Sequence, residues 1–325
     1  MESALRSQSL HDEIIRNAVS SSAAGRSTLA ASWQRSLKLY ALDPQSRQRR
    51  PRLDSSRLSE RREQSEKLLR SSDAAVSRLA TLTIEPGTGI FLSDNTGMIV
   101  NRRTRQSDNT EFDLLGLAVG ADWSEESEGT NAIGICLFEG RANTIWQDQH
   151  FFARNLPLVC IGAPIEAPDA TLAGVLNLSA CRGDITEIQA RLTAFAVQAA
   201  ALQISTALFH AEFERHKIIT LANQHGAGAA LVAVDQNELV VGANRLARRS
   251  LALSASKLRR CPPLSDILPE ANRVGANLAI ALRSEVIRAL KHADGNVAQA
   301  ARDLGIGRAT LYRKMTALGL EWRKL

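Results

Sequence analysis

Three glycines near the end of this 325-residue chain restrict its fold more than any other feature, because they interrupt a stretch of helical periodicity. Gly295, Gly305 and Gly319 can each adopt the left-handed backbone conformation in which helices commonly end. The apolar residues between these stops recur at spacings of three and four. The sequence therefore predicts three short helices, over residues 278–292, 297–304 and 308–318.

The same segment divides into an inside and an outside. Helical spacing predicts that one set of side chains forms the core: Ala300, Ala301, Leu304, Ile306, Leu311, Met315 and Leu318. Asn296 is expected to cap the second helix, with Gln299 reaching back in a variant of the capping box. The first helix presents Val286, Ile287 and Leu290, which we expect to form a local dimer interface together with residues 184–217. An ordinary three-helix bundle with a basic surface is the alternative.

The polar face of the third helix has the chemistry needed to bind DNA. Arg308 can bond a guanine edge, and Thr310 can contact a thymine methyl group or a phosphate. Between residues 283 and 325, nine basic residues face four acidic ones, a net +5 of the chain's +6. The expected DNA-binding residues are Asn296, Gln299, Arg308, Thr310, Tyr312, Arg313 and Lys314.

The middle of the chain changes to the pattern of an antiparallel sheet. Two pairs of apolar runs, 90–92 with 98–100 and 156–165 with 172–178, flank segments of turn-forming residues. A helical stretch around residues 131–139 lies between the two hairpins. The predicted fold class is α+β: an antiparallel sheet with flanking helices, followed by an all-α C-terminal unit.

The remaining segments connect these parts. We expect a helix over 28–40, a solvated arginine-rich connector over 47–62, and a long amphipathic helix from Asp184 to about Lys217. Residues 230–234 and 239–241 are predicted strands, followed by a helix over 244–253.

Composition narrows the function classes. Four dispersed cysteines without a CxxC pair argue against a disulfide framework or a zinc ribbon. No run approaches the roughly 18 apolar residues of a membrane span. We therefore expect a cytoplasmic protein without membrane contact, cofactor, metal or catalytic residues.

The amino-acid sequence of the last predicted helices closely resembles a known DNA-binding element. Gly295 to Lys314 reads Gly-Asn-Val-Ala-Gln-Ala-Ala-Arg-Asp-Leu-Gly-Ile-Gly-Arg-Ala-Thr-Leu-Tyr-Arg-Lys, which resembles the Fis-type helix-turn-helix of bacterial enhancer-binding activators. The chain departs from that family at Gly307, where serine or asparagine usually caps the helix. Glycine is tolerated there at a cost of a few tenths of a kcal/mol.

Residues 28–210 resemble the GAF sensor of the acetoin catabolism regulator family, whose members are sigma-54-dependent activators. The resemblance depends on several motifs in order: Ser32 to Ser36 (Ser-Trp-Gln-Arg-Ser), Leu42-Asp43-Pro44, Glu128 to Gly134 (Glu-Gly-Thr-Asn-Ala-Ile-Gly), His150-Phe151-Phe152, Ala163-Pro164-Ile165 and Gly174 to Ser179. The segment 229–253 is similar to the opening of a PAS domain, but too few residues follow to complete one.

One part of that family's organisation is missing. The sequence contains no Gly-Lys dipeptide, so it has no phosphate-binding GxxxxGK[ST] loop, and the sigma-contacting signature is also absent. Only about 25 residues separate the PAS-like remnant from the helix-turn-helix, too few for an AAA+ ATPase domain. ATP-driven remodelling of sigma-54 polymerase therefore does not carry over.

A GAF fold implies an effector pocket, and seven residues are candidates for it: Trp123, Thr130, Asn131, Cys136, His150, Phe152 and Cys160. Each also has a structural interpretation, as core residue, helix cap or helix start. A metal site formed by Cys136, His150 and Cys160 is an alternative that lacks diagnostic spacing.

The sequence thus predicts a transcription regulator that couples a small-molecule or redox signal to operator binding. Its expected partners are double-stranded DNA, an unknown effector, a second copy of the chain and RNA polymerase. The alternatives are a non-ATPase partner that modulates a full-length activator, and a GAF-type thiol enzyme. The predicted divisions are a helical segment over 1–70, the GAF-like domain over 71–210, the PAS-like remnant and linker over 211–270, and the helix-turn-helix over 278–325.

Overall fold

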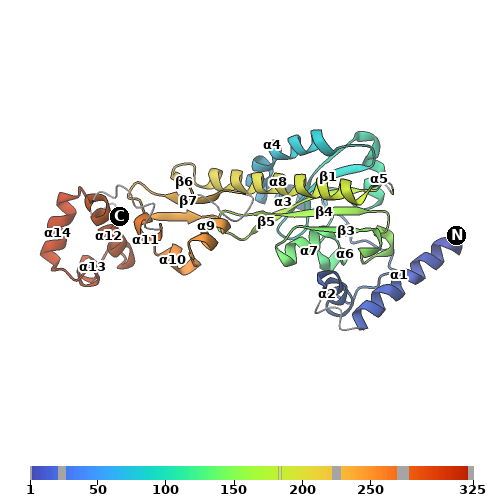
Figure 1. The fold of residues 1–325 in the computed structure, drawn as a ribbon, viewed down its shortest axis with the longest axis horizontal. Helices are drawn as coiled ribbons and strands as arrows, with labels where there is room; N and C mark the ends of the chain where they lie inside the picture. The colour runs from blue at the N-terminus through green and yellow to red at the C-terminus, as the bar shows by residue number, and fades with distance from the viewer. Residues whose placement is uncertain are drawn as a thin grey trace. The chain divides into compact units, whose positions relative to one another are not determined.

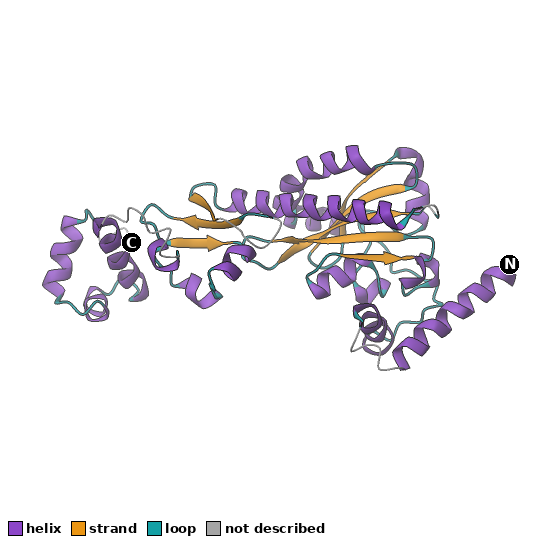
Figure 2. Ribbon diagram, in the orientation of Figure 1, coloured by secondary structure: helices purple, strands orange, loops and turns teal. Residues whose placement is uncertain are grey.

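The computed structural model describes residues 2–20, 27–181, 183, 185–221, 228–268 and 278–320, with the side chains of 2–9, 20 and 278–281 outside the description. The chain forms two compact units. The N-terminal unit comprises Met1–Ala167 and Thr171–Leu208, and the C-terminal unit comprises Pro168–Ala170 and Phe209–Leu325. Figures 1 and 2 show the helices and strands of each unit.

A five-stranded antiparallel sheet organises the N-terminal unit. Its spatial order is β2-β1-β5-β4-β3. The strands are β1 (Thr88–Asp94), β2 (Ile99–Thr104), β3 (Asn143–Trp146), β4 (Val159–Glu166) and β5 (Leu172–Ala180). This arrangement confirms the predicted α+β class and both predicted hairpins.

The first hairpin forms because Asp94 fixes its turn. The Asp94 Oδ1 atom accepts hydrogen bonds from the backbone N–H groups of Thr96 (2.8 Å) and Met98 (3.1 Å). A short side chain that bonds the backbone two residues later is typical of turns. The strand and turn composition of residues 88–104 is therefore sufficient to specify this element.

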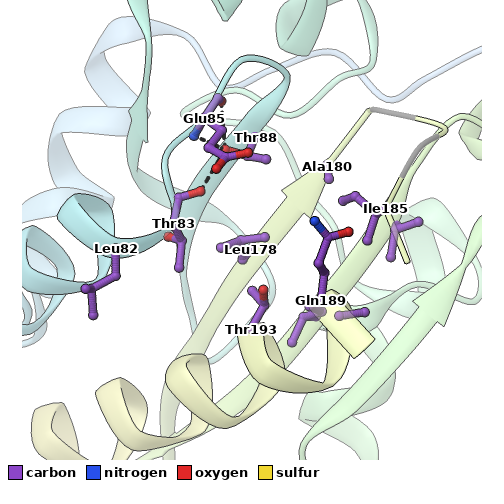
Figure 3. A pocket seen from close by; sticks show the side chains of 12 residues that line it. Leu82, Thr83, Glu85, Thr88, Leu178, Ala180, Ile185, Gln189 and Thr193 are labelled. Atoms are coloured by element: carbon purple, nitrogen blue, oxygen red, sulfur yellow. Dashed lines mark hydrogen bonds between the residues drawn. The ribbon is translucent and has the colours of Figure 1, made fainter. Parts of the chain in front are cut away.

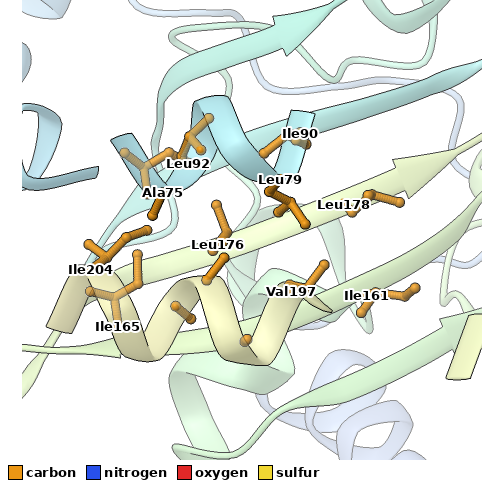
Figure 4. Close-up of a cluster of buried hydrophobic side chains, with 14 of the residues drawn as sticks. Ala75, Leu79, Ile90, Leu92, Ile161, Ile165, Leu176, Leu178, Val197 and Ile204 are labelled. Carbon is orange, nitrogen blue, oxygen red and sulfur yellow. The ribbon is translucent and has the colours of Figure 1, made fainter. Parts of the chain in front are cut away.

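Two long helices cover one face of the sheet, α4 (Glu66–Thr83) and α8 (Glu187–Glu212) (Figure 1). Alternate residues of the strands point toward these helices, as the two-residue period of a strand requires. Figure 4 shows the core that results, formed by Ala75, Leu79, Ile90, Leu92, Ile161, Ile165, Leu176, Leu178, Val197 and Ile204. The sequence predicted α8 but placed its end too late, since Lys217 begins a strand. The predicted first residue, Asp184, lies outside the described residues.

Shorter helices cover the other face: α5 (Asn109–Leu114), α6 (Glu125–Glu128) and α7 (Ala132–Glu139). The predicted helix over 131–139 is confirmed. Phe91 of β1 and Phe112 of α5 meet edge to face, with ring centroids 5.3 Å apart. This face holds most of the predicted effector residues, so its packing decides whether they are accessible.

The N-terminal helices are α1 (Glu2–Ser20), α2 (Thr28–Gln34) with a π-helical continuation (Arg35–Leu39), and α3 (Ser55–Gln64). The predicted helix over 28–40 is confirmed. The predicted solvated connector is wrong for four of its arginines, because Arg49, Arg50, Arg52 and Arg61 form ion pairs with acidic residues of the GAF-like domain.

The C-terminal unit begins with a three-stranded antiparallel sheet in the order β6-β7-β8: β6 (Lys217–Leu221), β7 (Ala230–Val234) and β8 (Val240–Ala243). Three short helices follow: α9 (Arg245–Ser250), α10 (Ala255–Arg259) and α11 (Leu264–Ile267). The sequence predicted β7 at its observed bounds, and β8 and α9 to within a few residues.

The last three helices are α12 (Leu278–His292), α13 (Val297–Asp303) and α14 (Arg308–Ala317). They enclose a separate core of Val286, Leu290, Val297, Ala300, Ala301, Leu311 and Met315, with Leu304, Ile306 and Leu318 packed against it. The predicted inside residues of this unit are therefore confirmed.

Candidate functional site

The turn between α13 and α14 has the geometry that a helix-turn-helix requires. Gly305 has a φ of +65°, a left-handed conformation that side chains other than glycine adopt at a cost. Asn296 caps α13, its side-chain oxygen accepting from the N–H groups of Ala298 and Gln299. Gln299 does not complete the expected capping box, because its side chain bonds Asp303 and Arg302 instead.

The outer face of α14 is basic. Arg308 and Arg313 are exposed, and Thr310 and Lys314 are half-buried. Within the described part of the chain, none of the three basic residues of α14 forms an ion pair, and residues 304–320 contain no acid. Tyr312 is 39% exposed, with its ring 5.7 Å from the Arg308 guanidinium carbon.

The basic residues of α12 have partners in the protein. Arg283 donates to Asn237 Oδ1 at 2.9 Å, Arg288 pairs with Glu285, and Lys291 Nζ lies 4.0 Å from Asp235. Arg323 and Lys324, also part of the predicted charge excess, lie outside the described residues. Of the helices α12 and α14, α14 is therefore the one whose positive charges are available to a polyanion.

The predicted dimer interface on α12 is wrong. Val286, Ile287 and Leu290 are each no more than 3% exposed, and Val286 and Leu290 belong to the core of the three helices. Side chains that fill a domain core cannot also meet a second copy without opening that core.

Four of the seven effector candidates have structural roles. Trp123 is buried, and its indole N–H donates to the Gly116 carbonyl at 2.9 Å. Asn131 caps α7 through the Gly134 N–H, and Phe152 packs against Phe151. Thr130 is buried against the N-terminal helices, and its hydroxyl oxygen lies 2.8 Å from the hydroxyl oxygen of Ser32.

The other three candidates are buried ionisable groups. Burial raises the pKa of the Cys136 and Cys160 thiols to about 12. Burial also lowers the pKa of His150 to about 4. Among the described residues no three His, Cys, Asp or Glu side chains cluster as a metal would require, so nothing supports the alternative metal site.

The Ser-Trp-Gln-Arg-Ser motif meets a second motif, Glu128 to Gly134, where the hydroxyls of Ser32 and Thr130 lie 2.8 Å apart. It also bonds residues just before that motif and just before His150-Phe151-Phe152. Arg35 donates two hydrogen bonds of 2.7 Å to the carboxylate of Glu125, in the forked geometry that arginine favours. Ser32 donates to the same carboxylate. The Trp33 indole N–H donates to the Gln149 carbonyl at 2.9 Å. The Ser-Trp-Gln-Arg-Ser motif therefore docks the N-terminal helices onto the GAF-like domain.

Glu128 opens the second motif and is the centre of another buried network. Its Oε2 atom accepts from Arg49 (3.1 Å), Arg154 (3.0 Å) and Asn155 (3.2 Å). The neighbouring Gly129 has a φ of +59°, and a Cβ there would lie 2.6 Å from Phe151. The motif needs glycine at this position because the aromatic ring already occupies the space.

Two families match the chain. Residues 5–205 match the MimR N-terminal domain, which is more than half of the chain. The chain belongs to the MimR N-terminal domain family. Residues 283–318 of this MimR-family chain match the Fis family of bacterial regulatory proteins, so its C-terminal unit contains a Fis-type DNA-binding helix-turn-helix.

The curated relatives of this MimR-family chain are transcription regulators. It is 29% identical over 249 residues to the acetoin catabolism regulatory protein of Cupriavidus necator, covering 74% of this chain and 35% of the relative. It is 30% identical over 120 residues to the propane 2-monooxygenase operon transcriptional activator MimR of Mycolicibacterium smegmatis, covering 35% of this chain and 20% of the relative. The chain thus spans about a third or less of these relatives' lengths.

A solved structure shares the fold of this MimR-family chain. The Escherichia coli DhaR(N)–DhaL complex aligns with a TM-score of 0.51 at 18% identity, covering 74% of this chain and 82% of that chain. The similarity supports the GAF-like fold of the N-terminal unit. At 18% identity it says nothing about which ligands this chain binds.

One pocket of this MimR-family chain lies on the α4–α8 face, away from the seven candidates (Figure 3). Its volume is about 150 Å³. Leu82, Thr83, Leu178, Gln189 and Thr193 are among the residues that line it. The sequence did not single out any of them, because a pocket between sheet and helices depends on packing rather than on a local motif.

Proposed function

We propose that this chain is a cytoplasmic transcription regulator in which the GAF-like domain responds to a small molecule or redox signal and the Fis-type unit binds an operator. We further propose that it acts without ATP-driven remodelling of sigma-54 polymerase. The proposed domains are residues 1–70, 71–210, 211–270 and 278–325. The proposed DNA contacts are Asn296, Gln299, Arg308, Thr310, Tyr312, Arg313 and Lys314.

The unpaired basic face of α14 carries the proposal for DNA. Protein contacts hold the basic residues of α12, whereas Arg308, Arg313 and Lys314 have no acidic partner in the described part of the chain. Cations left without protein partners on a recognition helix are suited to phosphates and guanine edges.

The connection between the matched regions supports the absence of an ATPase step. Only residues 206–282 separate the MimR-type region from the Fis-type region, and the sequence has no GxxxxGK[ST] loop. A signal from the GAF-like domain would therefore act on DNA binding, or on polymerase directly.

The burial of Cys136 and Cys160 weighs against a redox cue sensed at either of these two thiols. A thiol reacts as its thiolate, and burial holds Cys136 and Cys160 in the protonated form at neutral pH. The same argument weighs against a thiol enzyme.

Sequencing of genomic DNA fragments captured by the purified chain tests the proposal. The wild type and an Arg308→Ala, Arg313→Ala double variant are compared at two salt concentrations. Arg215→Ala is the matched control, because that arginine side chain is 90% exposed and lies outside the helix-turn-helix.

We expect discrete palindromic sites that the double variant loses and the control retains. Weak, salt-sensitive capture of all fragments, equal in the wild type and the double variant, would contradict specific recognition by α14.

A further inference from the structure

The turn between β7 and β8 buries a polar side chain against the helix-turn-helix. Asn237 is 7% exposed, although connecting segments normally lie at the surface. Its side-chain oxygen accepts from Arg283 Nε at 2.9 Å, and its backbone carbonyl accepts from the Ser284 hydroxyl. Both partners belong to α12, the first helix of the helix-turn-helix unit. The β7–β8 turn is therefore bonded to that unit by both the side chain and the backbone of one residue.

The turn itself is held in place by its own hydrogen bonds. The Asp235 Oδ1 atom accepts from the backbone N–H groups of Asn237 (2.8 Å) and Leu239 (3.0 Å), which is the bonding of an Asx turn. At the start of α11, the Leu264 N–H donates to the Glu238 carbonyl at 2.9 Å. Because the turn is fixed from both sides, it presents Asn237 to α12 in a defined position.

Arg283 connects this turn to the end of α14. Its Nε atom donates to Asn237, and its Nη1 atom donates to the Leu318 carbonyl. Leu318 is the C-cap of α14. The last carbonyls of a helix lack partners within the helix, and a cation beside them is favourable. One guanidinium group thus bonds the β7–β8 turn and the C-terminal end of α14 at the same time.

The contact leaves the basic face of α14 uncovered. In the described part of the chain, the hydrogen bonds and ion pairs between the turn and the helix-turn-helix end on α12. None of them reaches Arg308, Arg313 or Lys314. An autoinhibitory contact would have to cover or neutralise these side chains. The arrangement therefore favours a role in holding α14 over a role in blocking it.

We propose that Asn237 is a positioning residue of the helix-turn-helix: through Arg283 it fixes the C-terminal end of α14, which makes the PAS-like remnant a working part of the DNA-binding unit. This inference rests on the proposed function, because the position of α14 matters only if α14 reads DNA. Base edges are read by hydrogen bonds of defined direction, whereas phosphates attract any nearby cation. A loosened α14 therefore loses its preference for the captured sites before it loses binding to unrelated DNA.

Hydrogen exchange of the full chain without DNA tests whether Asn237 holds α14. In Asn237→Ala, exchange of the amides at the end of α14 should accelerate roughly ten-fold, the effect of losing about 1.4 kcal/mol of protection. Asn237→Asp keeps the oxygen acceptor for Arg283, so it should exchange like the wild type. Gln236→Ala is the matched control, because Gln236 is the exposed neighbour in the same turn and should leave exchange unchanged.

A double-mutant cycle tests the path through Arg283. Arg283→Ala alone should accelerate exchange at least as much as Asn237→Ala, and adding Asn237→Ala to it should change nothing further. Equal exchange in the wild type and Asn237→Ala, or additive effects of the two substitutions, overturns the proposal. Acceleration spread evenly over the core amides of α12, α13 and α14 would show that Asn237 only stabilises the unit, and would also overturn it.

DNA affinities of the same variants separate this inference from the proposed function. Asn237→Ala should bind a captured site roughly ten-fold more weakly and an unrelated duplex within about two-fold of the wild type, while Asn237→Asp restores the affinity for the site. Equal affinities of wild type and Asn237→Ala for the site overturn the positioning role and leave the regulator standing. If the wild type captures no sites, the proposed function fails, and the exchange data still decide whether Asn237 holds α14.

Discussion

Glu128 shows how much the GAF-like domain depends on single buried charges. Its carboxylate forms ion pairs with Arg49 and Arg154, which lie before and after Glu128 in the sequence. Glu128→Ala would leave both guanidinium groups without their main partner. We expect the free energy of unfolding to fall by about 3 kcal/mol, as for other buried pairs that lose one member.

Urea denaturation of the full chain, followed by near-ultraviolet circular dichroism, measures this effect. Glu126→Ala is the matched control, because the Glu126 side chain is 62% exposed and should cost little. Equal denaturation midpoints for the two variants would refute the importance of the Glu128 network.

The burial of His150 should make the free energy of unfolding depend on pH. Burial lowers its pKa from 6.5 to about 4, so the unfolded chain takes up a proton in this range and the folded chain does not. The free energy of unfolding therefore falls as the pH drops from about 6.5 to about 4, by roughly 3 kcal/mol from this group. In His150→Leu the decline over this range should be smaller than in the wild type or in His210→Leu, where an exposed histidine is removed. Parallel pH profiles for all three proteins would rule out this assignment.

The cysteines should differ in reactivity. Cys261 is half-exposed, whereas Cys136 and Cys160 are buried with a pKa of about 12. At pH 8 a disulfide reagent should label Cys261 first and reach the two buried thiols only after denaturant is added. Peptide mass analysis gives the order. Rapid labelling of Cys136 or Cys160 in the native protein would revive the redox alternative.

At the scale of elements, we expect serine at two glycine positions of the helix-turn-helix to change its stability in opposite directions. Gly305 has a positive φ, so Gly305→Ser should destabilise the turn by about 1 kcal/mol. Gly307 is the N-cap of α14, with extended backbone and no side-chain cap, so Gly307→Ser should add a few tenths of a kcal/mol.

Hydrogen exchange of α13 and α14 peptides in the full chain compares the two serine variants. Exchange should accelerate roughly five-fold in Gly305→Ser and slow slightly in Gly307→Ser. The same direction of change in both variants would contradict the assigned backbone roles.

Local patterns predicted the elements that local chemistry determines. The helix 278–292 and the strand 230–234 have the bounds that the sequence indicated, because glycine stops and apolar runs fix them. Helix α4 was missed, since its apolar face lacks comparable caps. The end of α8 was placed too late because residues 213–217 carry no proline or glycine to mark the break.

At the scale of the whole molecule, the errors concern contacts between distant residues. Arg49 lies 79 residues from Glu128 in the sequence, so no local pattern distinguishes it from a solvated arginine. The effector candidates span residues 123–160, and the structure uses Trp123, Asn131 and Phe152 for packing and capping. The basic outer face of α14 was predictable because it is local, with the core and the basic residues on adjacent helices.

The central claim is that α14 reads DNA sequence. Its most direct test is the affinity of wild type, Arg308→Ala and Lys314→Ala for a captured site and for an unrelated duplex, across a range of salt concentrations. We predict that Arg308→Ala weakens binding to the captured site by roughly 5- to 150-fold while sparing the unrelated duplex. Lys314→Ala should weaken both equally and reduce the salt slope by about one. Equal losses on both duplexes for Arg308→Ala, or no loss, would contradict the claim.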